Sequence, residues 1–98
     1  MSQDLQALGK SLDSKDVTIR REAAETLARV GPEAVGVALP LVQACGDEDE
    51  EVRNWAVAAL EELPAPNASN SAALEKLING SNLDIAFWSA TLLGRMAA

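Results

Sequence analysis

A period of 33 residues runs through the whole chain. It is clearest at Ile19, Val52 and Ile85, which we take as position 0 of three successive units. Apolar or small residues match at five further positions, namely Leu8/Leu41/Leu74, Leu12/Cys45/Ile78, Ala23/Ala56/Ser89, Leu27/Leu60/Leu93 and Val30/Leu63/Met96. A fixed period of this length is typical of a solenoid, in which each unit buries its apolar face against its neighbours. The period therefore predicts a stack of units with an extended surface for binding.

Each unit is expected to contain two antiparallel helices. The matching residues after position 0 follow helical spacing, and a composition rich in Ala and Leu with only 3% aromatic residues favours close-packed helices. The expected first helices span residues 3–13, 33–45 and 69–79, and the expected second helices span residues 16–30, 49–63 and 82–96. The predicted fold class is all-α. It is an α-solenoid of three helical hairpins, forming one domain over residues 1–98 with repeats over about 3–31, 32–64 and 67–98.

Local signals mark the ends of these helices. A short polar side chain precedes each expected second helix and can accept hydrogen bonds from its free backbone amides. These cap residues are Asp16, Asp49 and Asn82. Pro40 lies inside the expected helix 33–45 and should kink or restart it. Gly46 and Gly80 follow expected first helices, where a left-handed backbone is common.

The repeating apolar positions also predict the core. Residues expected to be buried at equivalent places are Ala23, Leu27, Val52, Ala56, Leu60 and Leu93. Cys45 takes the place of Leu12 and Ile78 in the repeat, so we interpret it as a small core residue and not as a reactive thiol.

Charge and composition exclude several classes of function. The chain has eight Lys and Arg against fifteen Asp and Glu, a net charge of −7, which disfavours nucleic acid and anionic membranes as partners. It contains no His and a single Cys, so the commonest general base, the commonest transition-metal ligand and an internal disulfide are missing. We expect no catalytic residue, no metal and no cofactor. With no signal peptide and no apolar stretch of ~20 residues, we expect a cytoplasmic protein.

The acidic run at residues 47–51 has two interpretations. It could be a calcium loop, but it lacks the alternating ligands, central Gly and closing Glu of that motif. We favour a turn whose carboxylates lie beside the positive end of the following helix.

Two segments resemble the second helix of HEAT repeats. These are DSKDVTIRREAAETLARVG (13–31) and DEDEEVRNWAVAALEEL (47–63), each with an acid, then Ile-Arg or Val-Arg, then small residues and a Leu. LPLVQAC (39–45) is similar to the proline-containing first helix of that family. The third unit departs from the pattern, because Asn82 replaces the acid and Ala86 replaces the Arg. A ladder of Asp–Arg pairs between repeats should therefore stop after the second repeat.

The resemblance implies an interaction module. HEAT proteins are mostly scaffolds and adaptors, and bacterial HEAT-like repeats also resemble bilin-lyase subunits. The expected function is therefore non-catalytic binding of a protein or peptide partner. Two alternatives are a fragment or subunit of a lyase-like, chromophore-handling enzyme and, less favoured, a nucleic-acid-binding solenoid.

The resemblance places a ligand on the concave face, which the second helices line. On a helical wheel the arc opposite the apolar stripe is exposed, with Trp55 and Trp88 at its edge. The candidate partner-binding residues are Arg21, Glu25, Asn54, Trp55, Phe87, Trp88, Thr91 and Arg95. The two tryptophans could form an aromatic shelf, or they could instead fill gaps between repeats.

The expected helix 82–96 is apolar nearly all round, although a terminal repeat normally presents a polar face. A second copy of the chain, a partner protein or further repeats should cover it, and a two-fold homodimer is the simplest closed solution. The alternative is that Phe87 and Trp88 fold back over the neighbouring helix 69–79 and leave a compact monomer.

Overall fold

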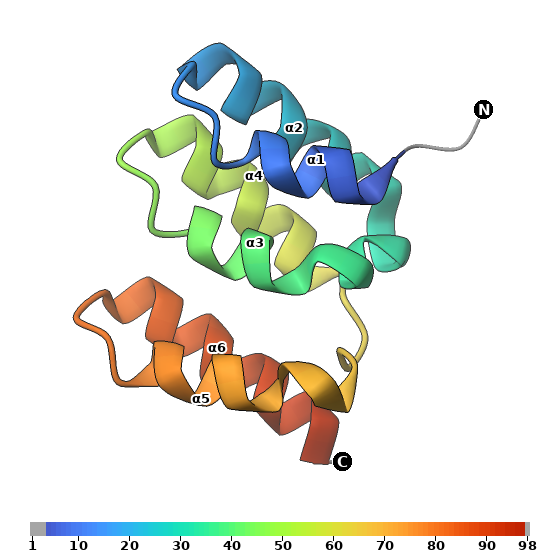
Figure 1. Cartoon of the computed structure of the whole chain (residues 1–98), viewed down its shortest axis with the longest axis vertical. Coiled ribbons are helices and arrows are strands. Elements are labelled where there is room, and N and C mark those ends of the chain that lie inside the picture. The colour runs from blue at the N-terminus through green and yellow to red at the C-terminus, as the bar shows by residue number, and fades with distance from the viewer. Residues whose placement is uncertain (1–3, 98) are drawn as a thin grey trace.

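A computed structural model describes residues 4–97, which are mostly helical and contain no strand (Figure 1). The elements are α1 (Leu5–Ser11), α2 (Val17–Val30), the 3-10 helix η1 (Gly31–Val37), α3 (Ala38–Ala44), α4 (Glu50–Glu61), the 3-10 helix η2 (Ala68–Asn70), α5 (Ser71–Ile78) and α6 (Leu83–Ala97). They form three stacked hairpins, α1/α2, α3/α4 and α5/α6, which we call repeats 1, 2 and 3. The predicted all-α solenoid is confirmed.

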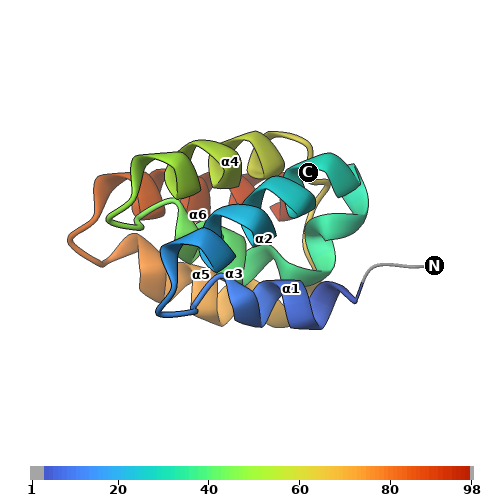
Figure 2. The ribbon, with the colours of Figure 1, turned by 90° about the horizontal axis from the view of Figure 1, so that it is seen from above.

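The hairpins align so that the helices form two layers (Figure 2). One layer contains α1, α3 and α5, which we call the A helices, and the other contains α2, α4 and α6, the B helices. The molecule is only 18 Å thick along its shortest axis, which fits two layers of helices. The B helices therefore line one broad face of a slab.

The expected cap residues begin the B helices. Each cap side chain accepts a hydrogen bond of 2.9–3.0 Å from a backbone amide two or three residues further on. The pairs are Asp16 with Thr18, Asp49 with Val52 and Asn82 with Ile85. These bonds satisfy amides that have no partner inside the helix, and they fix where each B helix starts.

The expected helix 33–45 is interrupted. Its first part belongs to η1. The helical backbone is interrupted at Val37, where φ is −124° and ψ is 37°, and α3 begins at Ala38. Pro40 therefore lies in the first turn of α3, where a backbone amide would have no partner inside the helix. The proline restarts the helix, as expected.

The prediction of left-handed glycines after the A helices is wrong. Among residues 4–97 a positive φ occurs at Gly31, at 81°, and not at Gly46 or Gly80. Gly46 is needed for a different reason, since a Cβ there would lie 2.5 Å from Cδ1 of Ile85. The absence of a side chain lets the start of α6 approach the end of α3.

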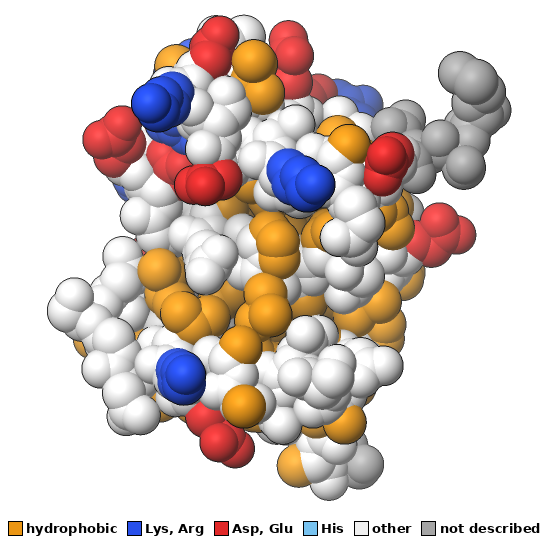
Figure 3. All heavy atoms as spheres, viewed as in Figure 1, with side chains coloured by type: hydrophobic (Ala, Val, Ile, Leu, Met, Phe, Trp, Pro, Cys, Tyr) orange, Lys and Arg blue, Asp and Glu red, His pale blue; other side chains and the backbone are white. Residues whose placement is uncertain are grey.

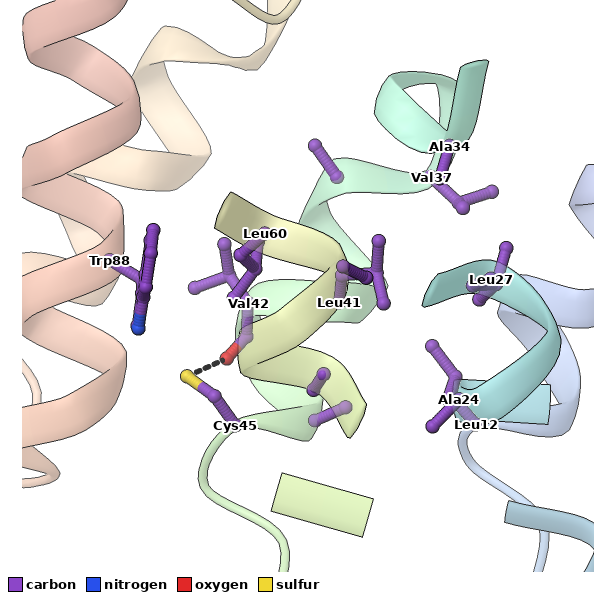
Figure 4. Packing of buried hydrophobic residues seen from close by; sticks show 14 of the residues in the cluster. Leu12, Ala24, Leu27, Ala34, Val37, Leu41, Val42, Cys45, Leu60 and Trp88 are labelled. Carbon is purple, nitrogen blue, oxygen red and sulfur yellow. Dashed lines mark hydrogen bonds between the residues drawn. The ribbon is translucent and has the colours of Figure 1, made fainter. Parts of the chain in front are cut away.

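One cluster of buried side chains connects the three repeats (Figure 4). It includes the expected core residues Ala23, Leu27, Val52, Ala56 and Leu60, together with Cys45. The prediction for Leu93 is wrong, because this residue is half-buried and its neighbour Leu92 is fully buried instead. Cys45 is a core residue, and its thiol donates a 2.8 Å hydrogen bond to the carbonyl of Val42.

Candidate interaction surface

One side of each B helix faces the preceding repeat. We call it the upstream side, and its burial rises along the chain at the position three residues after position 0. Glu22 is exposed in repeat 1, Trp55 is half-buried in repeat 2 and Trp88 is buried in repeat 3. Among residues 4–97 no hairpin precedes repeat 1, so the gradient in burial follows the place of each helix in the stack.

The opposite side of each B helix faces the following repeat, and we call it the downstream side. Its burial falls along the chain at the position five residues after position 0. Ala24 is buried in α2, Val57 is half-buried in α4 and Ala90 is exposed in α6. Of the three B helices, α4 thus has a neighbouring hairpin on both sides, whereas α2 and α6 have one on a single side.

Arginine–aspartate pairs join repeats 1 and 2. Nε of Arg20 lies 2.9 Å from Oδ2 of Asp47, and Nη2 of Arg21 lies 2.7 Å from Oδ1 of Asp49. The hydrogen bond from Arg21, assisted by the backbone amide of Val52, lowers the pKa of Asp49 from 3.8 to about 2. Two of the five acids in the 47–51 run, Asp47 and Asp49, are therefore used in stacking, as partners of arginines on the downstream side of α2.

Repeats 2 and 3 are joined differently. Trp88 points from α6 toward Val42, Leu60 and Cys45 of repeat 2 (Figure 4), and its side chain is 9% exposed. Nη1 of Arg95 donates hydrogen bonds of 3.0 and 2.8 Å to the carbonyls of Leu60 and Leu63 at the end of α4. The guanidinium also lies 5.9 Å from the centre of the Trp88 ring. One arginine and one aromatic ring thus attach the last hairpin.

These contacts change the expected site. Trp88 is in the interior and not at the edge of an exposed arc, so the aromatic shelf with Trp55 does not form. Arg95 and Arg21 hold repeats together, and Glu25 forms a 2.7 Å ion pair with Arg29 one helical turn away. The interpretation of the tryptophans as gap fillers is correct for Trp88.

The remaining candidates lie at the surface of the B helices. Asn54 is exposed, Trp55 and Thr91 are half-buried, and Phe87 is 61% exposed. The ring of Phe87 meets that of Trp88 edge to face, with centroids 5.4 Å apart, so the buried tryptophan supports the exposed phenylalanine. Phe87 is therefore an ordered apolar side chain at the surface, which is the usual character of an interface anchor.

The face formed by the A helices has a groove between α1 and α3, with a volume of about 390 Å³. Its walls combine Gly9, Leu12 and Pro40 with the charged residues Lys10 and Asp13. On this face charged side chains gather over repeat 1, and hydrophobic atoms show between repeats 2 and 3 (Figure 3). The thiol of Cys45 lies in the core, and burial raises its pKa to about 11, which disfavours the reactive thiolate at neutral pH.

Residues 5–94 match the family model of HEAT repeats. The chain belongs to the HEAT-repeat family. No curated protein matches the chain. HEAT repeats generally mediate protein interactions or scaffolding and are generally non-catalytic. No helix within the described residues is long and apolar enough to cross a membrane.

The HEAT stack also contains surface residues that the sequence analysis missed. Leu83 is 84% exposed at the start of α6, and Ile78 is 36% exposed at the end of α5. The 33-residue period could have indicated the exposure of Ile78. The equivalent residues Leu12 and Cys45 are buried and are each followed by another repeat, whereas Ile78 belongs to the last repeat described.

Proposed function

We propose that this HEAT-repeat chain is a non-catalytic interaction module that binds a protein or peptide partner through its B-helix face and α6. The main support for the proposal is the exposure of Phe87. Its side chain is 61% exposed and packs edge to face on the ring of Trp88. An ordered aromatic side chain of this kind can enter a pocket of a partner at a low cost in conformational entropy.

The charges of the chain indicate the chemistry of the partner. Glu61 and Glu62, at the end of α4, are both exposed, and the whole chain carries a net charge of −7. Opposite charges across an interface increase the rate of association and select among partners. We therefore expect a partner segment with apolar anchors flanked by Lys or Arg, whose affinity falls as salt concentration rises.

Affinity capture from cells that express the protein tests this proposal. Phe87→Glu and Asn54→Arg change exposed residues, so both variants should stay folded while losing at least tenfold of the captured partner. Ala72→Glu is the matched control, because Ala72 is exposed on α5, in the other helix layer. Trp88 is unsuitable for substitution, since its ring belongs to the core.

The proposal fails if both folded variants retain the partner as well as the wild type does. It also fails if Ala72→Glu weakens capture as much as the two B-helix variants. Thermal melts followed by circular dichroism would establish that the variants are folded.

A further inference from the structure

Asn79 and Gly80 form the start of the turn between α5 and α6, and both residues are exposed. They are the one Asn-Gly pair in the chain. In such a pair the backbone nitrogen of the glycine can attack the side-chain amide carbon of the asparagine, because no side chain on the glycine obstructs the approach. A spontaneous chemical step is therefore available in this turn.

The same turn follows the A helix in every repeat, and the three turns lie on one side of the stack (Figure 1). The backbone amides of Asp13, Gly46 and Asn79 each donate to the carbonyl three residues earlier, over 3.0, 3.1 and 3.2 Å. The next amide in each turn does likewise, and that of Gly80 lies 3.2 Å from the carbonyl oxygen of Leu77. Repeat 1 has an aspartate at the position of Asn79, so this turn accommodates an ordinary aspartyl residue.

The other asparagines are less suited to the reaction. The side-chain oxygens of Asn67 and Asn82 accept hydrogen bonds of 2.8 and 3.0 Å from backbone amides, which hold these side chains in place. Asn54 lies inside α4 and Asn70 is the last residue of η2. Each of the four is followed by a residue that has a side chain.

The folded turn slows the reaction at Asn79 without preventing it. At ψ of 0° the Gly80 nitrogen is rotated away from the Asn79 side chain, and its N–H is hydrogen-bonded to Leu77. Ring closure therefore requires the last turn of α5 to open. This opening is easy, because the end of an exposed eight-residue helix frays at little cost in free energy.

We propose that Asn79 is a spontaneous modification site, at which deamidation yields aspartyl and isoaspartyl residues. The Gly80 nitrogen loses its proton to solvent and bonds to Cγ of Asn79, the bond from Cγ to Nδ2 breaks, and Nδ2 takes a proton from solvent and leaves as ammonia. Water then opens the resulting succinimide ring. Attack at Cγ gives the aspartyl residue, and attack at the main-chain carbonyl carbon gives the isoaspartyl residue. The proposal is independent of the proposed function.

The two products have different effects on the fold. Either product loses the 3.4 Å hydrogen bond from Nδ2 to the carbonyl of Glu75, and either places a negative charge beside the negative end of α5. The aspartyl product otherwise keeps the main chain that repeat 1 already has at Asp13. The isoaspartyl product adds a methylene group to the main chain, which moves the Gly80 amide away from the Leu77 carbonyl. The isoaspartyl form should therefore loosen α5 much more than the aspartyl form does.

Incubation of the folded chain in mildly alkaline buffer made with heavy-oxygen water tests the reaction. Peptide mass spectrometry measures the replacement of amide nitrogen by labelled oxygen at each asparagine, and an isoaspartyl methyltransferase detects the isoaspartyl product. We expect Asn79 to react at least tenfold faster than Asn67 or Asn82. The rate should rise with pH, because the attacking nitrogen must lose its proton.

Gly80→Ala is the matched control. An added Cβ would lie 3.4 Å from the carbonyl oxygen of Leu77, an ordinary contact, and the φ of Gly80 is not positive, so the turn should keep its structure. The methyl group obstructs the attacking nitrogen, and we expect deamidation at Asn79 to slow at least tenfold. Equal rates in Gly80→Ala and wild type would overturn the proposed mechanism.

Two further results would overturn the proposal. One is a chain that reacts at Asn79 in urea but not when folded, because the native turn would then prevent the reaction. The other concerns the products, which chromatography separates. Hydrogen exchange in α5 should be at least tenfold faster in the isoaspartyl form than in Asn79→Asp, and equal exchange would refute the predicted effect on the turn. Capture of a partner enters none of these measurements, so the proposed function can fail or succeed separately.

Discussion

Leu60 and Leu93 occupy the same position of successive repeats, yet their surroundings differ. Leu60 is fully buried in the core on α4, whereas Leu93 is half-buried on α6. The loss from truncating a side chain depends on the contacts removed and on the cavity left behind. The same substitution should therefore have different effects at the two sites.

We predict that Leu60→Ala lowers the free energy of unfolding by about 2–5 kcal/mol, and that Leu93→Ala lowers it by clearly less. Urea denaturation followed by circular dichroism measures both values. A Leu60→Ala loss no larger than that of Leu93→Ala would contradict the repeat register that places Leu60 at the centre.

Asp49 supplies a prediction about pH. Its pKa is lowered from 3.8 to about 2 in the folded chain, chiefly by the hydrogen bond from Arg21. The ionised carboxylate therefore favours the folded state above about pH 4, and this stabilisation is lost as the pH falls toward about 2. We expect wild type to be more stable than Arg21→Met at pH 7, with the difference shrinking between pH 4 and pH 2.

Asp49→Asn is the control for this titration, since an amide can still cap α4 but does not ionise. In the Asp49→Asn background, the effect of Arg21→Met should vary much less over the same pH range, because only the longer 4.0 Å pair of Arg21 with Glu51 remains. A difference between wild type and Arg21→Met that stays constant from pH 7 to pH 2 would exclude the pair as the cause.

At the scale of elements, α6 is attached to the stack by contacts unlike those of α4. Its backbone approaches α3 at Gly46, and Arg95 bonds to the carbonyls of Leu60 and Leu63 at the end of α4. The Leu60 carbonyl accepts one backbone hydrogen bond, of 3.2 Å from the Leu63 amide, and has room for a second donor. A cation at this end of α4 is favourable both as a donor and as a charge beside the negative helix end. Arg95 thus connects the last B helix to its predecessor.

We predict that Arg95→Met lowers the free energy of unfolding by about 1–3 kcal/mol, since it removes hydrogen bonds from a charged donor. Arg29→Met is the control, because it breaks an exposed ion pair with Glu25 on one helix, worth about 0.3–0.5 kcal/mol. Chemical denaturation compares the two, and equal losses would mean that Arg95 does not connect the helices.

At the scale of the whole molecule, the two boundaries between repeats differ in their contacts. Repeats 1 and 2 share two arginine–aspartate pairs and the extensive packing of α2 on α4. Repeat 3 is connected through the segment Pro64-Ala65-Pro66, the Trp88 ring and Arg95. In a solenoid the stability of each boundary adds separately to the total, so a weaker boundary opens first.

We predict that native-state hydrogen exchange finds α5 and α6 opening at a lower free energy than α2 and α4. Arg95→Met should speed exchange in α5 and α6 while leaving α2 unchanged. If all three hairpins exchange together at the global free energy of unfolding, the chain opens as one cooperative unit and the third repeat is not separately mobile.

The sequence by itself determined the helical hairpins, their period and their starts. Asp16, Asp49 and Asn82 cap helices through bonds to residues two or three positions away, and Pro40 acts on its own helix. These effects are local, so they can be read from neighbouring residues. The recurrence of Leu27 and Leu60 likewise identified the core, since the same face of each helix meets its own hairpin partner.

Only the tertiary structure decided which equivalent residues are exposed. Trp55 and Trp88 match in the repeat and each has a preceding hairpin, yet Trp55 is half-buried, whereas Trp88 is buried against Val42, Leu60 and Cys45 of repeat 2. Gly46 is required by Ile85, which lies 39 positions later in the sequence. Burial at these sites depends on how closely the neighbouring hairpin packs against them, and that is set by the stacking of the repeats and not by any local pattern.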